Sequence, residues 1–237
     1  MKFTLCIPMY NEAKVIAQTA KRLDKYMSSR FGDYEIIFSD DGSTDGSADI
    51  VKSLCLPCVR VIGYSDNRGK GSAVREAMLA ATGDAVMFTD SDLAYGTEVI
   101  GQIADAFEAH PECDLVVGSR NIAKNGYDGY TLTRKMASKG YIAVLKALGG
   151  LKISDSQCGC KAFRKEAAEK IFSYCVVNGF AFDFEAILLA NKLGYKIYEH
   201  PVKVINHGES KVSVIGDAVR MLGDIIKMKK RISGLDI

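Results

Sequence analysis

The first 120 residues alternate short apolar runs with longer stretches in which apolar residues recur at helical spacing. Short apolar runs bounded by turn residues predict buried strands, and a strand–helix alternation is typical of a parallel sheet. Strands are expected at residues 3–9, 34–39, 59–64, 85–89 and 115–119. Helices are expected between them, at residues 13–28, 45–54, 71–81 and 96–109. This pattern predicts an α/β fold with a mostly parallel sheet flanked by helices.

Beyond residue 120 the alternation weakens. Residues 121–130 are rich in glycine and polar side chains, which predicts a loop. Helices are expected at 131–148 and 182–193, an irregular stretch at 153–163 and an edge-like segment at 196–205. Because no shift in composition marks a linker, residues 1–237 are predicted to form a single domain.

The last predicted helix covers residues 212–231 and is amphipathic. Its apolar positions at helical spacing are Ile215, Ala218, Val219, Leu222, Ile225 and Ile226. Its end is basic, with Lys227, Lys229, Lys230 and Arg231. The apolar face either packs on the core or docks on an anionic membrane surface, where each basic residue adds about 1 kcal/mol of attraction.

Composition excludes several classes of function. The net charge of +2 gives no general attraction to nucleic acid, so we expect no nucleic-acid partner. No apolar stretch approaches the roughly 20 residues that a membrane-spanning helix needs. Seven cysteines without a secretion signal are typical of reduced thiols, so we expect a cytoplasmic protein, peripheral on the inner face of the membrane if its last helix docks there.

Acidic side chains follow two of the predicted strands at the point where each ends. Asp90 and Asp92 come directly after the run 85–89, and an acidic turn at residues 40–45 follows the run 34–39. Ligands of open α/β sheets bind at the carboxyl ends of the strands. An Asp-x-Asp also occurs in solvated turns, but the second acidic turn and the segment 8–12 together favour a site. Carboxylates there suit Mg²⁺ or Mn²⁺, completed by substrate phosphates.

Lys70 lies between two glycines at the start of a predicted helix. The segment lacks the spacing and the hydroxyl residue of a Walker loop, so it does not predict an ATPase. No Gly-x-Gly-x-x-Gly follows a strand, which disfavours a dinucleotide enzyme. A lysine near a helix N-terminus nevertheless suits an anionic ligand.

Taken in order, these motifs resemble glycosyltransferase family 2, whose members have the GT-A fold. The matching segments are residues 8–12, 40–45, 69–71, 90–92 and 118–120. Residues 155–164, 182–185 and 210–212 are similar to the dolichyl- and polyprenyl-phosphate sugar synthases, and the glucosyltransferase branch matches better than the mannose synthase branch. The resemblance implies an inverting, metal-dependent enzyme that moves a hexose from a nucleotide sugar to a polyprenyl phosphate. UDP-glucose is the expected donor, with GDP-mannose as the alternative.

The resemblance also implies roles for individual side chains. The base of the donor would be held by Pro8, Tyr10, Glu12 and Asp41. Asp90 would lie against the ribose and the metal site, and Asp92 would be the direct metal ligand. The diphosphate and the acceptor phosphate would face Arg120, Arg134 and Lys211. Residues 1–120 would then bind the nucleotide sugar, and residues 121–237 the acceptor.

One departure and one open alternative bear on the acceptor. Mannose synthases of this group carry a metal-binding Gln where this chain has Ala94, which weakens a mannose assignment. A phosphate acceptor is already ionised near neutral pH and needs no general base. A saccharide hydroxyl of an envelope polymer would need Asp183 or Glu185 as base. A non-catalytic nucleotide-sugar-binding protein is a third hypothesis, disfavoured by the complete acidic set.

Overall fold

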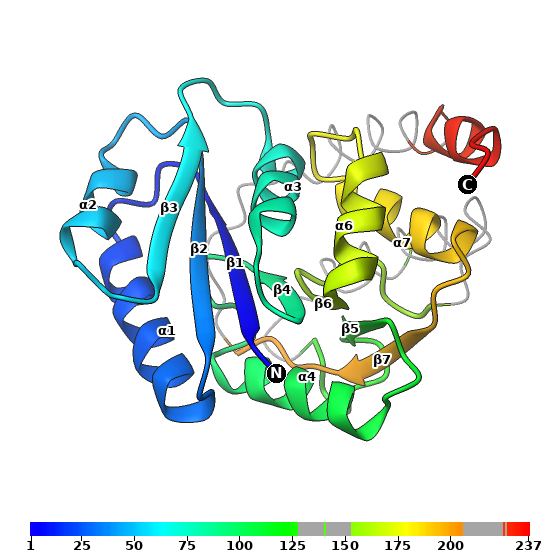
Figure 1. Ribbon diagram of the computed structural model, residues 1–237, viewed down its shortest axis with the longest axis horizontal. Helices are drawn as coiled ribbons and strands as arrows, with labels where there is room; N and C mark the ends of the chain where they lie inside the picture. Colours follow the sequence, from blue (N-terminus) through cyan, green and yellow to red (C-terminus); the bar gives the residue numbers. More distant parts are fainter. Residues whose placement is uncertain (128–139, 141–152, 206–224, 226) are drawn as a thin grey trace.

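The computed structural model describes residues 1–127, 140, 153–205, 225 and 227–237. In this part of the chain seven strands form one sheet in the order β3-β2-β1-β4-β6-β5-β7. The strands are β1 (Phe3–Met9), β2 (Tyr34–Asp41), β3 (Val59–Tyr64), β4 (Ala85–Thr89), β5 (Leu115–Ser119), β6 (Cys160–Arg164) and β7 (Ile197–Pro201). The helices are α1 (Ile16–Arg30), α2 (Ser47–Ser53), α3 (Lys70–Ala80), α4 (Glu98–Ala109), α6 (Lys165–Tyr174) and α7 (Phe182–Lys192) (Figure 1).

The parallel half of the sheet agrees closely with the sequence pattern. β1 pairs in parallel with both β2 and β4, and β2 pairs in parallel with β3. All five strands predicted in the first 120 residues are present, and only β2 differs in length, because it continues to Asp41. Since parallel strands end at the same edge, the segments after β1, β2 and β4 meet there.

Helices cover both faces of the sheet and define two cores. One core contains Ile16 of α1 and Phe107 of α4, packed against one face of the central strands. The other contains Val74 of α3, Phe172 of α6 and Phe184 of α7. Because successive side chains of a strand point to opposite faces, the continuous apolar strands contribute to both cores.

The irregular stretch predicted at 153–163 is wrong in its last part, because Cys160–Arg164 forms β6. β6 lies between β4 and β5 and is antiparallel to both. Its second residue, Lys161, is fully buried. Strands are predicted from runs of apolar residues, and lysine is counted as a residue that faces water. A lysine in a run of only five residues therefore prevents the strand from being predicted. The helix that follows, α6, was not predicted from the sequence.

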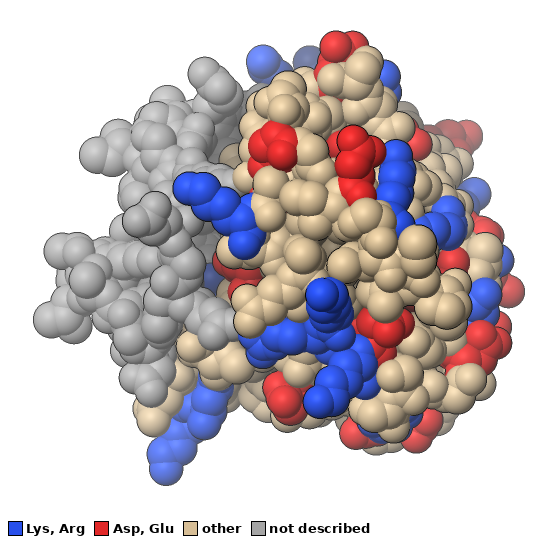
Figure 2. All heavy atoms as spheres, turned by 90° about the vertical axis from the view of Figure 1, so that its left-hand side faces the viewer, with Lys and Arg blue, Asp and Glu red and all other residues tan. Residues whose placement is uncertain are grey.

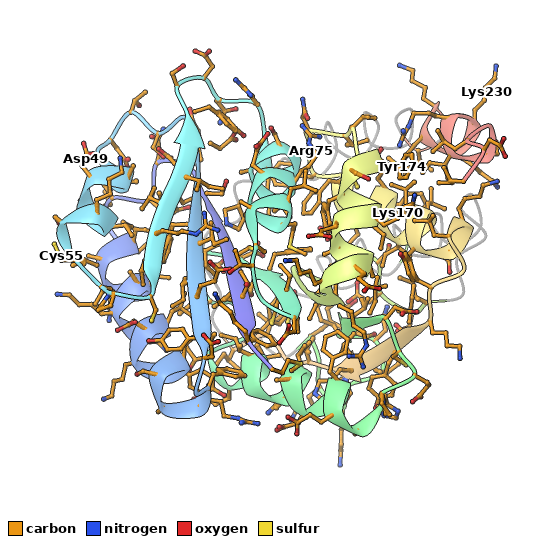
Figure 3. All side chains as sticks on the ribbon, viewed as in Figure 1. Asp49, Cys55, Arg75, Lys170, Tyr174 and Lys230 are labelled. Carbon is orange, nitrogen blue, oxygen red and sulfur yellow. The ribbon has the colours of Figure 1, made fainter. Side chains whose placement is uncertain are left out.

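The C-terminal part confirms two predictions and leaves others outside the described residues. Helix α7 lies close to the predicted range 182–193, and the edge-like segment at 196–205 contains β7, which pairs in parallel with β5. The predicted helix 131–148 and most of the predicted helix 212–231 lie outside the described residues. In the described end of the latter, Ile225 and Met228 are buried against the core of α3, α6 and α7, while Lys230 points outward (Figure 3).

The surface carries both signs of charge. On the face formed by α1, α2 and β3, Figure 2 shows basic and acidic side chains interspersed, with the basic ones most concentrated near the middle. Within the described residues no helix is both long and apolar enough to cross a membrane.

Candidate active site

The segment after β1 is fastened to the segment after β2. Asn11 adopts a left-handed backbone conformation (φ 53°), and its side-chain oxygen accepts a hydrogen bond from the backbone N–H of Thr44 at 2.9 Å. In return, the hydroxyl of Ser43 accepts the backbone N–H of Asn11 at 2.9 Å. Tyr10 keeps 41% of its surface exposed beside this double contact. These bonds fix Tyr10 and Glu12 at the carboxyl edge of the sheet, near the end of β2.

Asp41 organises the loop that leads into α3. Its buried carboxylate accepts hydrogen bonds from the Tyr64 hydroxyl (2.7 Å), the side-chain amide of Asn67 (3.0 Å) and the backbone N–H of Gly69 (2.9 Å). The backbone N–H of Arg68 adds a further bond of 2.9 Å. Asp41 therefore fixes the loop in front of Lys70, and its direct contact with a base stays a prediction.

The glycines around Lys70 allow this loop to pack against the segment before α7. The backbone N–H of Gly71 donates to the carbonyl of Asn178 at 2.7 Å. A Cβ on Gly69, where φ is +106°, would lie 2.5 Å from the same carbonyl, and a Cβ on Gly71 would lie 2.4 Å from the carbonyl of Val177. Only glycine fits both approaches.

Lys70, Asp90, Asp92 and Asp183 form one charged cluster at the end of β4. The Lys70 ammonium contacts the Asp90 carboxylate at 2.5 Å. Burial alone would lower the pKa of Lys70, but the charges of Asp90 and Asp183 outweigh it and raise that pKa. The sequence predicted only Asp90 and Asp92 at this strand end, and the structure brings Lys70 and Asp183 to them.

Asp92 is an acidic side chain of this cluster whose ionised form is disfavoured by its surroundings. Partial burial and then the nearby Asp90 charge raise the pKa of Asp92. One of its oxygens accepts the backbone N–H of Ala94 at 2.9 Å, and Leu93 between them is left-handed (φ 50°). Among the described residues no group of three or more His, Cys, Asp or Glu side chains is placed to hold a metal. Two carboxylates still fit Mg²⁺ or Mn²⁺, since substrate phosphates and water complete such sites.

The segment before β6 reaches into this cluster. Cys160 pairs with Thr89 at the end of β4, so the preceding residues lie beside Asp90. Gly159 lies so close that a Cβ there would be 2.3 Å from the Asp90 carboxylate. The buried Lys161 ammonium donates to the Cys158 carbonyl at 2.6 Å and pairs with Asp183. Lys161 is a residue of the site that the sequence analysis did not single out.

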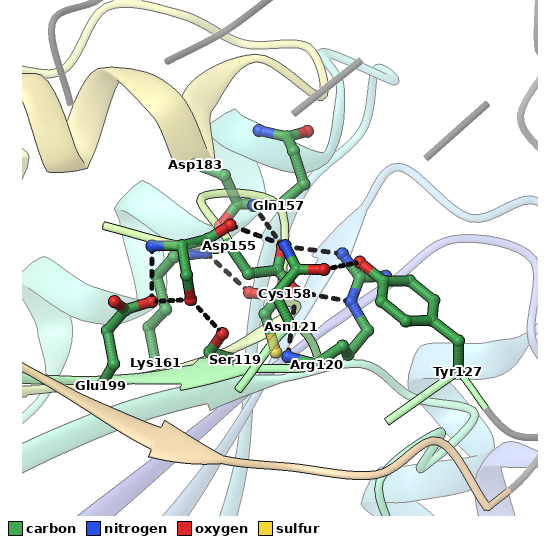
Figure 4. Close-up of polar contacts among 11 residues, drawn as sticks. Ser119, Arg120, Asn121, Tyr127, Asp155, Gln157, Cys158, Lys161, Asp183 and Glu199 are labelled. Atoms are coloured by element: carbon green, nitrogen blue, oxygen red, sulfur yellow. Dashed lines mark hydrogen bonds and ion pairs between the residues drawn. The ribbon is translucent and has the colours of Figure 1, made fainter. Parts of the chain in front are cut away.

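A second buried ion pair joins Arg120 to Asp155. Arg120 directs its guanidinium at the fully buried Asp155, with Nε–Oδ2 and Nη2–Oδ1 distances of 2.7 and 2.9 Å (Figure 4). The Tyr127 ring lies 5.4 Å from the same guanidinium. Desolvation alone would lower the pKa of Arg120, but the Tyr95 and Asp155 charges and the Asp155 hydrogen bond outweigh it and raise that pKa well above its usual range. Asp155 therefore sets how Arg120 is oriented, a role that was not predicted from the sequence.

The structure separates the two carboxylates of α7. The pKa of Asp183 is raised, mainly because the side chain is desolvated, although Lys161 and Lys70 act against this. Glu185 is fully buried and accepts the backbone N–H groups of Val176 and Val177 at 3.0 and 2.9 Å. Its other oxygen pairs with Arg231 at 2.6 Å. Asp183 thus belongs to the cluster, whereas Glu185 ties the C-terminal helix to α7.

Two predicted site residues, Arg134 and Lys211, lie outside the described residues. Of the other predicted site residues, Pro8 lies near the end of the buried strand β1, and Tyr10 and Glu12 follow this strand at the same edge of the sheet. His110 stacks on Tyr198 with ring centroids 3.9 Å apart.

Comparison with known proteins identifies the family. Residues 4–172 match the model described as "Glycosyl transferase family 2". The chain belongs to this family. It is therefore a glycosyltransferase, and the fold expected from the resemblance, GT-A, is the one that it adopts.

Among curated family 2 relatives, the chain is 29% identical to a dolichyl-phosphate beta-glucosyltransferase of Saccharomyces cerevisiae, over 94% of this chain and 72% of the relative. It is 28% identical to the enzyme of the same description from Dictyostelium discoideum, over 96% of this chain and 74% of the relative. Among solved structures, glucosyl-3-phosphoglycerate synthase from Mycobacterium tuberculosis with Mn²⁺, UDP-glucose and phosphoglyceric acid has a TM-score of 0.70. It is 19% identical over 100% of this chain and 81% of that chain.

Proposed function

We propose that this family 2 enzyme transfers glucose from UDP-glucose to a polyprenyl phosphate, with inversion at the sugar. The observation that carries the choice of acceptor is the state of the two carboxylates on α7. Asp183 is paired with Lys161, and Glu185 is used by Arg231 and two backbone N–H groups. An acceptor that arrives already ionised suits a site whose candidate bases are engaged. The curated relatives, which are described as dolichyl-phosphate glucosyltransferases, support the same choice.

The donor binds at the carboxyl edge of β1, β2 and β4 in this proposal. The loop fixed by Asn11 presents Tyr10 to the base, and Asp41 holds the neighbouring loop in place. A divalent cation, Mg²⁺ or Mn²⁺, would be held by Asp92 with Asp90, and when bound it neutralises charge on the diphosphate leaving group. Lys70 adds a positive charge at the same edge, next to Asp90.

The acceptor phosphate acts as the nucleophile. Its second pKa is ~6, so near neutral pH it is largely a dianion and attacks without losing a proton to the protein. Cations then have to hold two anions near each other, and this is the role proposed for Arg120, Arg134 and Lys211. The bidentate contact with Asp155 fixes the Arg120 guanidinium in advance, which saves ordering entropy when the substrates bind.

The enzyme works at the cytoplasmic face of a membrane, where it meets its lipid acceptor. The basic residues Lys227, Lys229 and Lys230 are exposed on the last helix, while Ile225 and Met228 on the same helix are buried in the core. The described end of this helix thus presents charge rather than apolar side chains to a leaflet. We propose attraction to anionic lipid headgroups as the source of its peripheral attachment.

A transfer assay with paired donors and acceptors tests the function. Purified enzyme with Mg²⁺ or Mn²⁺ is offered radiolabelled UDP-glucose or GDP-mannose, and either a polyprenyl phosphate or an envelope oligosaccharide. The expected result is organic-extractable label from UDP-glucose with the polyprenyl phosphate. Label that appears on the oligosaccharide instead would refute the lipid acceptor, and label from GDP-mannose alone would refute the donor.

A further inference from the structure

Gln157 lies in the segment that β6 brings to the end of β4, and neither the family roles nor the mechanism uses it. Because Cys160 pairs with Thr89, residues before β6 extend past the end of β4, beside Asp90 and Asp92. Gly159, two residues after Gln157, is in contact with the Asp90 carboxylate. The antiparallel strand therefore brings the segment that contains Gln157 to the end of β4.

The backbone on both sides of Gln157 is fixed. The backbone N–H of Gln157 donates to the Asp155 carboxylate at 3.2 Å, and Asp155 is held by Arg120. On the other side, the Cys158 carbonyl accepts the Lys161 ammonium at 2.6 Å. A side chain that starts from a backbone anchored in this way has a defined direction.

Among the described residues, the side-chain N–H₂ group of Gln157 is left without a partner. Its Nε2 atom is buried, and it has no hydrogen-bond partner among the described residues. In Figure 4 the side chain points away from the pair formed by Arg120 and Asp155, and no contact drawn there reaches its amide. A buried N–H₂ group without a partner costs free energy, which a ligand that accepts its hydrogen bond would recover.

We infer that the amide of Gln157 binds a hydroxyl group of the hexose that is transferred. The unpaired Nε2 atom is a donor, and a hydroxyl oxygen accepts such a hydrogen bond, whereas a metal ion does not. Asp90 and Asp92 end the strand that this segment reaches, and the proposed function assigns the metal ion to them. That ion would neutralise the diphosphate, to which the hexose is attached. The inference therefore rests on the proposed function and adds a residue that selects the sugar.

Calorimetry with Mn²⁺ present separates the sugar contact from the nucleotide contact. Gln157→Leu keeps the approximate size and removes the amide, and Gln102→Leu on the exposed surface of α4 is the matched control. The Kd for UDP-glucose should rise about 3- to 10-fold in Gln157→Leu, the loss expected for one neutral hydrogen bond, while the Kd for UDP changes less than 2-fold. The control should change neither value. Equal weakening of UDP and UDP-glucose, or no weakening of either, would overturn the inference.

Two further measurements test the chemistry of the contact. In a series of UDP-deoxyglucoses, one analogue should bind the wild type more weakly than UDP-glucose but bind Gln157→Leu with equal affinity. If every analogue kept its wild-type penalty in the variant, no hydroxyl would pair with Gln157. The Tm should stay level or rise, because the substitution removes an unpaired polar group, and a fall above about 5 °C would mean that Gln157 supports the fold instead. If the wild type transfers glucose from UDP-glucose and Gln157→Leu binds UDP-glucose with the wild-type Kd, this inference alone is rejected. If the wild type binds no nucleotide-linked hexose, the proposed function is rejected as well.

Discussion

Replacing Asp183 by Asn tests both the stability of the buried pair and the nature of the acceptor. Lys161 is fully buried, and the Asp183 side chain is 8% exposed. Removing one member of a buried pair leaves an uncompensated charge and costs about 3–5 kcal/mol. For a chain of this size we expect the Tm to fall by roughly 6–20 °C. The matched control is Asp105→Asn, because the Asp105 side chain is 60% exposed in its pair with Arg30 and should change the Tm little.

The double variant Lys161→Met/Asp183→Asn separates stability from catalysis. Without either charge, nothing ionised is left unpaired, although the Cys158 carbonyl loses its partner. Most of the lost stability should return, to within about 1–3 kcal/mol of the wild type. Thermal denaturation followed by circular dichroism gives this comparison.

The same double variant should transfer glucose to a polyprenyl phosphate at a rate within about 10-fold of the wild type, since loss of a general base costs ~100-fold or more. Initial rates with radiolabelled donor measure the effect. A folded double variant whose rate falls above about 1,000-fold would identify Asp183 as a base and contradict the phosphate acceptor. An unchanged Tm in Asp183→Asn would contradict the argument from the buried pair.

Three other perturbations follow from the structure. Asp92→Ala should abolish transfer and keep the wild-type Tm, because charge on the leaving diphosphate loses its neutralisation. EDTA should abolish transfer by the wild type for the same reason. Near wild-type rates of Asp92→Ala with Mn²⁺ would contradict the metal site. Binding to anionic vesicles, measured by sedimentation, should fall at least 10-fold when glutamates replace Lys227, Lys229 and Lys230. If neither these substitutions nor added salt weakened vesicle binding, electrostatic docking would be contradicted. Desolvation raises the pKa of Asp155, but Arg120 outweighs this effect, so the pKa of Asp155 is lowered in the folded protein. The pair therefore stabilises the fold above the unfolded-state pKa of ~3.9, and this contribution is lost as pH falls through the folded-state pKa. The Tm difference between wild type and Asp155→Asn should therefore be largest near pH 7 and shrink below pH ~4, and a constant difference would contradict this account.

The sequence predicted the parts of the site that lie at strand ends. Asp90 and Asp92 follow a continuous apolar run, and parallel strands bring their ends to one edge, so these carboxylates could be placed without coordinates. Lys70 was placed at the start of a helix by its glycines, and α3 does begin at that residue. These signals are local, because each depends on a few adjacent positions.

The parts that could not be predicted depend on distant partners. Lys161 reads as a surface residue until Asp183, 22 positions away, is seen to pair with it inside the protein. Asp155 has a role only because Arg120, 35 positions earlier, lies against it. Glu185 was a candidate base by sequence, and only its contact with Arg231 shows an anchoring role. Hydrophobic periodicity carries no information about such pairs.

The close packing of Gly69 and Gly71 against the carbonyls before α7 has an evolutionary consequence. A methyl group at either glycine would overlap backbone atoms, which cannot rotate away as a side chain can. The turn after β3 and the turn before α7 therefore cannot change length or path independently, although about a hundred residues separate them in the chain. Among homologues we expect insertions in these two turns to be rare or to occur together, and a chimaera that exchanges only one of them should fold poorly.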